Sequence, residues 1–143
     1  MESIEARQTA IVNEFAQIKS WEDRYKKIIA MGKELPEQEP AFYDDKFLVK
    51  GCQSRVWLHA SLDDGKVILR ADSDAMIVKG LVSILLKVYS GLTPTEILST
   101  PPTFIEELGF KSYLSPSRAN GFLSMTKQIM LYATAFKMTQ EGR

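Results

Sequence analysis

The stretch RVWLHASLDDGKVILRA, Arg55–Ala71, decides the fold of this chain. Its first half alternates apolar and polar side chains, which predicts a strand with one buried face over residues 55–62. Residues 63–65, DDG, are typical of a tight hairpin turn, and Val67–Ala71 continues as the returning strand. Phe47–Val49 is predicted to add a third strand, so the sequence indicates a small three-stranded antiparallel sheet.

Helical patterns precede this sheet. Apolar residues recur at spacings of three, four and seven near the N-terminus, which predicts a helix with one buried face. A second helix is predicted from Trp21 to about Met31, with Ser20 as its N-cap, Asp23 as the capping-box partner and Gly32 as its C′ residue.

Helical patterns also follow the sheet. The apolar run 76–88 predicts a largely buried helix that ends at Gly91. The motif TPTE at 93–96 combines an N-cap, a proline at the first helical position and a glutamate at the third. Thr103 with Glu106 is predicted to repeat this cap before a last helix opens at Ser115-Pro116. This order predicts one α+β domain over residues 1–143, its sheet packed against N- and C-terminal helices.

Charge and composition exclude several classes of protein. The 143 residues carry 18 Lys and Arg against 18 Asp and Glu, so no basic footprint for nucleic acid or a membrane surface stands out. No apolar stretch is long enough to span a bilayer, and the acidic N-terminus has no signal-peptide core. The single cysteine cannot form an internal disulfide. We therefore expect a cytoplasmic protein that binds no nucleic acid and no membrane.

The single cysteine, Cys52, lies in the sequence GCQS at 51–54. A free cysteine is most often a small buried hydrophobic residue. Here the neighbours are polar, and Gly51 allows a turn that presents the thiol at the tip of a loop. Lys50, Arg55 or a distant arginine could favour the thiolate. Local chemistry therefore leaves a reactive thiol and an inert one about equally supported.

Other chemistry has little support. His59 is the only histidine, and a Cys52/His59 thiol hydrolase would use it as base, but a partly exposed strand residue is the favoured interpretation. One Cys and one His cannot hold a structural zinc ion or an iron–sulfur cluster. Asp72 and Asp74 could meet a hard cation, yet a place at a helix N-terminus already explains them. Arg118 is either a surface arginine or a cation near an anionic sulfur.

At this point the residues resemble a known family. The sequence GCQSRVWL at 51–58 resembles the signature of the SufE family, whose members work with cysteine desulfurases. Further matching blocks follow in the family's order and cover roughly residues 15 to 135. They are Trp21, Arg24-Tyr25, Ile28-Ile29, Gly32-Lys33, Leu35-Pro36, DSDA at 72–75, IVKGL at 77–81, LSPSR at 114–118 and Asn120-Gly121.

The resemblance implies a SufE/NifU-like fold and a definite role. A SufE-like protein binds and stimulates a SufS/CsdA-like cysteine desulfurase, accepts its persulfide sulfur, and relays it to a SufBCD-like iron–sulfur scaffold. Cys52 would then be the nucleophile that becomes a persulfide. Gly51, Gln53 and Ser54 would shape its loop, whereas Asp74 and Arg118 would support the loop or contact a partner.

The resemblance also implies that Cys52 is sheltered at rest in a shallow apolar cavity, against Trp57 or the 77–81 face. No cofactor of its own and no stand-alone turnover are expected, since pyridoxal phosphate would belong to the desulfurase. We expect a monomer or a weak dimer. Three alternatives stay open: a CsdE-type acceptor that serves another pathway, the thiol hydrolase, and a passive binding module with an inert cysteine.

Overall fold

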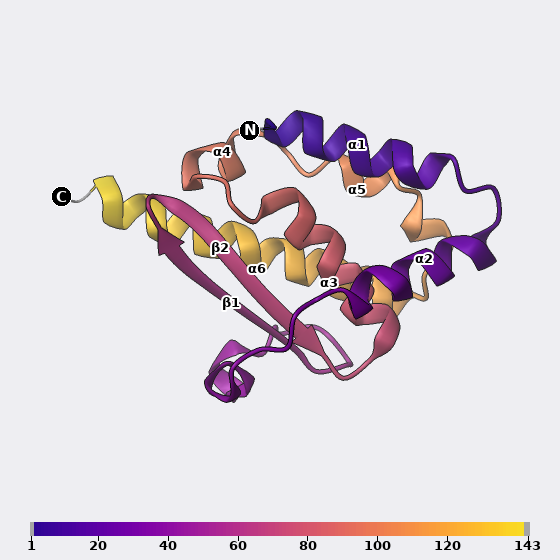
Figure 1. The fold of residues 1–143 in the computed structure, drawn as a ribbon, viewed down its shortest axis with the longest axis horizontal. Coiled ribbons are helices and arrows are strands. Elements are labelled where there is room, and N and C mark those ends of the chain that lie inside the picture. The colour runs from indigo at the N-terminus through magenta and orange to yellow at the C-terminus, as the bar shows by residue number, and fades with distance from the viewer. Residues whose placement is uncertain (1, 142–143) are drawn as a thin grey trace.

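The computed structural model describes residues 2–141, in which one β-hairpin packs along one side of a group of helices (Figure 1). The helices and strands, in order, are α1 (Ile4–Ala16), α2 (Trp21–Lys33), β1 (Val56–Asp63), β2 (Lys66–Ser73), α3 (Met76–Tyr89), α4 (Pro94–Ser99), α5 (Phe104–Glu107) and α6 (Pro116–Glu141). Three short 3-10 turns complete the set: η1 (Pro40–Tyr43), η2 (Asp45–Phe47) and η3 (Phe110–Ser112). The predicted α+β class is therefore confirmed, but the number of strands is not.

The hairpin has the predicted register and turn. β1 and β2 pair antiparallel from Val56 opposite Ser73 to Asp63 opposite Lys66. Asp64 and Gly65 both have positive φ, 52° and 77°, as a two-residue turn between right-twisted strands requires.

The predicted third strand at Phe47–Val49 is wrong. A 3-10 turn occupies Asp45–Phe47, because the Asp44 carboxylate accepts the backbone N–H of Lys46 at 2.9 Å and holds the chain curled. Leu48 alone forms an isolated antiparallel bridge, with Trp57. In the described residues the sheet is therefore two-stranded.

Helix α3 is the centre of the packing. Ten of its side chains or backbone positions are buried, and it contacts α1, α2, α6 and β2. It packs closely against α2, since a Cβ atom on Gly80 would lie 2.0 Å from the carbonyl oxygen of Ile28. A Cβ atom on Gly32 would lie 2.7 Å from the Gly80 nitrogen, and α2 continues past Gly32 to Lys33. Gly32 is therefore a helix-contact residue, and its prediction as the C′ residue is wrong.

Two of the three predicted helix caps form, and the backbone conformation of the cap residue explains the difference. Ser20 accepts the N–H of Asp23, which confirms the N-cap without the predicted return bond from the Asp23 side chain, and Thr93 with Glu96 forms a complete capping box, as predicted. Thr103 does not cap α5 with its side chain, because its own backbone is already helical (φ −65°, ψ −23°). A capping side chain needs an extended backbone to reach back to the first turn.

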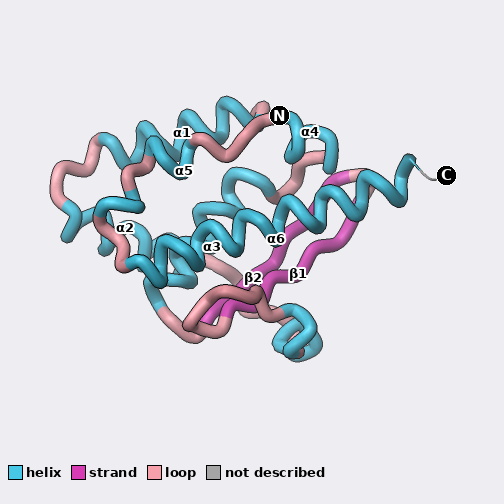
Figure 2. The backbone as a smooth tube through the Cα atoms, turned by 180° about the vertical axis from the view of Figure 1, so that it is seen from behind, coloured by secondary structure: helices cyan, strands magenta, loops and turns pink. Residues whose placement is uncertain are grey.

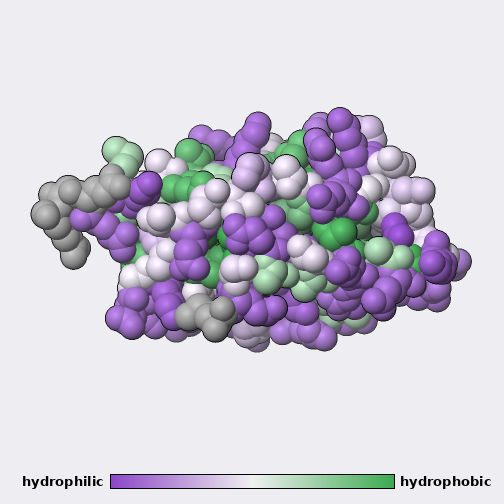
Figure 3. Space-filling view, turned by 90° about the horizontal axis from the view of Figure 1, so that it is seen from above, coloured by the Kyte–Doolittle hydropathy of each residue, from purple (hydrophilic) through white to green (hydrophobic). Residues whose placement is uncertain are grey.

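Helix α6 runs along the hairpin when the molecule is seen from behind (Figure 2). The Tyr132 hydroxyl donates to the Leu58 carbonyl oxygen at 2.8 Å and links α6 to β1. Seen from above, over α1, the surface is largely hydrophilic with small separate apolar patches (Figure 3). No helix within residues 2–141 is long and apolar enough to cross a membrane.

Candidate functional site

The loop at residues 50–54 lies against α6, immediately before β1. Gly51 has φ +91°, a conformation that suits glycine and turns the chain sharply. A Cβ atom on Gly51 would lie 2.6 Å from Ser124 Oγ. The missing side chain at residue 51 is therefore what lets the loop approach α6.

Cys52 follows this turn and is half-buried against the same helix. Its Sγ lies 3.6 Å from the Gly121 carbonyl oxygen, to which the S–H donates. The sulfur lies directly over Gly121, because a Cβ atom there would be in van der Waals contact with Sγ at 3.4 Å. Burial raises the pKa of the Cys52 thiol, so the resting group is neutral at physiological pH.

The thiol opens onto a pocket of about 440 Å³. Val78 and Leu81 of α3 supply apolar lining, so the cavity uses the 77–81 face and not Trp57. Trp57 instead packs edge-on against Tyr43 and under the Arg55 guanidinium. The full lining is Cys52, Gln53, Ser54, Val78, Leu81, Ser115, Ser117, Arg118, Gly121 and Met125.

Arg118 shares this pocket with Cys52, Gln53 and Ser54. It stands in the first turn of α6, where its backbone N–H donates to Ser115 Oγ at 3.3 Å, and its side chain is exposed. Burial is the cause of the raised pKa of Cys52. The guanidinium lines the same pocket as the thiol.

Asp74 is not among the described residues that line the pocket; it directly follows β2 and pairs with Arg55, the residue before β1. Its carboxylate accepts the backbone N–H of Arg55 at 3.1 Å, and its own N–H donates to the Arg55 carbonyl at 3.3 Å. This pair of bonds fixes the chain directly after the Cys52 loop. Asp74 therefore supports the loop from its C-terminal side.

Asp72 and Asp74 are not helix caps. Helix α3 begins at Met76 behind Ala75, without a side-chain cap. Asp72 accepts the Tyr43 hydroxyl at 2.6 Å and lies 3.2 Å from Lys79 Nζ. Burial works against its charge, but these bonds together lower the pKa of Asp72. The two acids tie loop segments to the hairpin.

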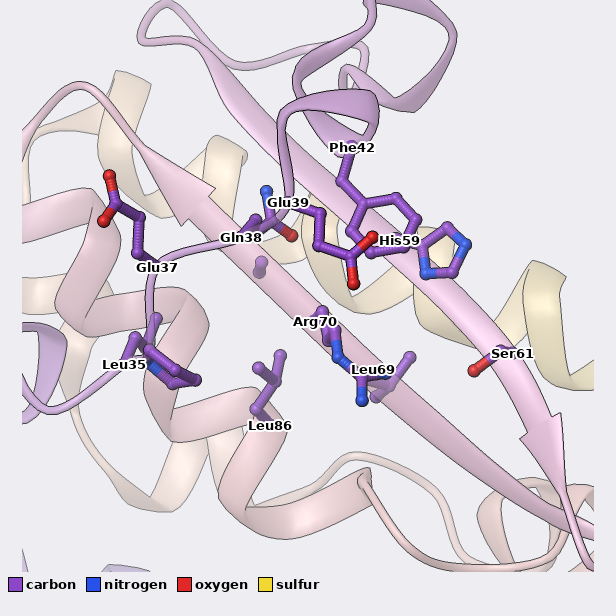
Figure 4. A pocket seen from close by; sticks show the side chains of 12 residues that line it. Leu35, Glu37, Gln38, Glu39, Phe42, His59, Ser61, Leu69, Arg70 and Leu86 are labelled. Atoms are coloured by element: carbon purple, nitrogen blue, oxygen red, sulfur yellow. The ribbon is translucent and has the colours of Figure 1, made fainter.

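His59 occupies a different part of the molecule from Cys52. Its ring stacks on Phe42 with 4.0 Å between the ring centres, beside a separate cavity of about 600 Å³ between residues 35–42 and β2 (Figure 4). Burial, Arg70 and Lys46 lower the pKa of His59. His59 is not among the described residues that line the thiol pocket. A histidine base beside the thiol, which a hydrolase would need, is therefore absent from the described lining of that pocket.

Sequence reasoning missed two α6 residues that make the site. Gly121 and Ser124, one turn apart, form the seat for the loop: the first faces Cys52 Sγ and the second faces Gly51. The available signal was a glycine inside a predicted helix. Glycine destabilises a helix, so its presence suggests that another segment packs closely at that position. Elsewhere, no group of three or more His, Cys, Asp or Glu side chains within residues 2–141 is placed to hold a metal ion.

Comparison with known proteins shows which family the chain resembles. Residues 9–133 match the SufE family, described as an Fe-S metabolism associated domain. An uncharacterized SufE-like protein of Synechocystis sp. is 43% identical over 133 residues, which cover 91% of this chain and 82% of that protein. An uncharacterized SufE-like protein of Rhizobium meliloti is 40% identical over 138 residues, which cover 93% of this chain and 94% of that protein.

A solved structure shares the fold. The solution structure of a hypothetical protein from Thermus thermophilus superposes with a TM-score of 0.77 over 92% of this chain and 96% of that chain, at 21% identity. The family match spans most of the sequence and includes the Cys52 loop and its α6 seat. The chain therefore belongs to the SufE family, whose domain is associated with iron–sulfur metabolism.

Proposed function

We propose that this protein is a sulfur acceptor that binds a pyridoxal-phosphate cysteine desulfurase, stimulates it, and carries its sulfur on Cys52. The observation that carries the proposal is the placement of Cys52. The single thiol of the chain is half-buried on a glycine-started loop, at a pocket whose described lining includes no histidine. Such a thiol suits transfer between two other proteins, since neither a second cysteine nor a histidine is needed.

The transfer step balances without an external oxidant. The Cys52 thiolate attacks the outer sulfur of the donor persulfide, a new S–S bond forms at Cys52 Sγ, and the donor's S–S bond breaks. The donor cysteine leaves as a thiolate with the electron pair and takes up the proton that Cys52 lost. In onward transfer to an iron–sulfur scaffold the same exchange occurs with Cys52 as the donor. The outer sulfur of its persulfide is attacked, and Cys52 leaves as the thiolate.

Because the thiol is sheltered, the desulfurase must also make it reactive. Burial keeps Cys52 protonated, and a neutral thiol is a poor nucleophile, so the loop must leave its seat or meet a cation before attack. We propose that docking of the desulfurase draws the loop outward and that Arg118 then accompanies the anionic sulfur. Shelter at rest also protects the thiol and its persulfide from oxidation.

Desulfurase turnover in the presence of this protein tests the proposal. Alanine release from cysteine should rise when the wild-type protein is added and should stay at its basal rate with Cys52→Ser. His59→Ala should stimulate like wild type, because His59 lies at a different cavity. Equal stimulation by wild type and Cys52→Ser would contradict the sulfur-acceptor role and favour a passive binding module.

Arg118→Ala provides a separate test of the pocket. We expect weaker stimulation and a higher half-saturating concentration of the acceptor, since the variant removes a cation that shares the pocket with the loop. Arg118→Lys should recover part of the effect, because it restores the charge without the planar guanidinium. Stimulation by Arg118→Ala that equals wild type at every concentration would remove this residue from the site.

The CsdE-type acceptor remains the second candidate. It shares the thiol, the loop and the transfer chemistry, and it differs only in which desulfurase loads it and where the sulfur goes. Parallel titration of a SufS-like and a CsdA-like desulfurase would separate the two, since the true donor should be stimulated at the lower acceptor concentration.

A further inference from the structure

A second hollow borders the Cys52 loop and shares no lining residue with the thiol pocket. We name it the lysine groove; it measures about 430 Å³ and is lined chiefly by Lys46, Lys50, Lys127, Phe47, Leu131 and Tyr132. Ser124 lines the groove and also contacts Gly51, so one α6 residue joins the groove to the loop. Lys50 comes two residues before Cys52 in the chain.

The groove carries unbalanced positive charge. No acidic residue is among the described residues that line it, and the ammonium groups of Lys50 and Lys127 have no ion-pair partner in that part of the chain. Lys46 lies over the Phe47 ring. The nearby Asp45 is already paired with Arg55 at 3.1 Å. Asp44 and Asp45 directly precede Lys46, so the net positive charge of the groove rests chiefly on Lys50 and Lys127.

The floor and wall of the groove are apolar. Leu131 is 62% exposed, which is high for a leucine on a packed helix. Tyr132 is fixed by its hydrogen bond to Leu58, and Phe47 packs edge-on against His59. The groove therefore offers one exposed apolar side chain, Leu131, beside two aromatic rings and three lysines.

The thiol pocket is also lined by a positive charge. Arg118 lines it, and no described Asp or Glu does. The Cys52 loop thus borders two hollows that both present cations and, among their described lining residues, no carboxylate. A partner that reaches Cys52 must cover this region, and a carboxylate-rich surface fits both hollows.

Resting on the proposed function, we infer that the lysine groove is a docking site for the sulfur donor, and that it receives an acidic segment of the desulfurase bearing an apolar side chain. The carboxylates pair with Lys46, Lys50 and Lys127, and the apolar side chain packs on Leu131. Because Lys50 belongs to the loop and Ser124 lies beside Gly51, a segment bound in the groove would contact the Cys52 loop. Electrostatic attraction of this kind mainly accelerates association and weakens as salt screens the charges.

The test measures the second-order rate of Cys52 persulfidation by the desulfurase, with acceptor and donor at limiting concentrations. Lys127→Glu should lower this rate about tenfold at low ionic strength, and the deficit should shrink at high salt. Leu131→Asn should lower the rate by a factor that salt does not change. Lys87→Glu reverses an exposed lysine beside the hollow between α1 and α3 and should leave the rate unchanged.

Loading of Cys52 by glutathione persulfide, which needs no docking, separates the outcomes. The variants should all match wild type with this small donor. Equal desulfurase rates for Lys127→Glu, Lys87→Glu and wild type at every salt concentration would overturn the groove as a docking site and leave the sulfur-acceptor role intact. A wild-type protein that glutathione persulfide loads but the desulfurase does not would overturn the proposed function itself.

Discussion

Two glycines help to set the position and burial of the Cys52 thiol. Gly51 lets the loop approach α6, and the sulfur then lies over the bare backbone of Gly121. The burial that results is the physical cause of the raised pKa of the thiol. The reactivity of Cys52 is therefore set by residues that carry no side-chain chemistry of their own.

Gly121→Leu should displace the thiol from its seat. The new side chain would fill the space beside Sγ, expose Cys52 and return its pKa toward the value of a free thiol. A lower pKa leaves more of the thiol ionised at pH 7, so alkylation by iodoacetamide should be faster than in the wild-type protein. The pH profile of alkylation should also shift to lower pH.

Asn120→Leu is the matched control for this substitution. It adds the same side chain at the preceding, exposed position, which does not line the thiol pocket. Its alkylation rate should equal that of wild type. Equal rates for Gly121→Leu and wild type across the pH range would show that Gly121 does not position the sulfur.

At the scale of elements, the α2–α3 contact holds the thiol pocket together. Val78 and Leu81, which line the pocket, lie on either side of Gly80, where α2 approaches α3 most closely. Gly80→Ala should destabilise the protein by about 2–4 kcal/mol, because the Cβ atom would meet backbone that cannot move independently. Gly65→Asn, at a hairpin turn with open space and positive φ, should cost much less in the same urea titration.

The Tyr43–Asp72–Lys79 contacts link the loop before the thiol to the hairpin and to α3. The pKa of Asp72 is lowered below its ordinary 3.8, so its contribution to stability is present above that pH and is lost as the pH falls through the folded-state pKa. Asp72→Asn should cost about 1 kcal/mol at pH 7, a modest value because solvent screens the partly exposed pair. The difference from wild type should vanish in strongly acidic solution. A difference that stays constant down to that pH would contradict the ionic contribution.

Local sequence patterns predicted the elements well where the stabilising interactions were themselves local. The hairpin turn at residues 63–65, the N-cap at Ser20 and the capping box at Thr93 depend on residues within four positions of one another, and all three are confirmed. Phe47–Val49 and Gly32 were assigned wrongly, because a side-chain cap at Asp44 and a distant helix at Gly80 decide their conformations.

For the whole molecule, the sequence predicted the family but not how the site residues are arranged in space. The motif around Cys52 indicated the family that the comparisons confirm. That Arg118 shares the thiol's pocket, that Asp74 binds the Arg55 backbone, and that Gly121 and Ser124 seat the loop all depend on how α6 packs across the chain. No pattern within a single segment records such long-range placement.

The intact mass of the protein tests the central claim most directly. After incubation with a cysteine desulfurase and cysteine, without reductant, the wild-type protein should gain mass in steps of one sulfur atom. Cys52→Ser should gain none, and Arg118→Ala should still gain sulfur but more slowly. Wild-type protein that gains no sulfur from desulfurases it binds, or Cys52→Ser that gains as much as wild type, would contradict the account.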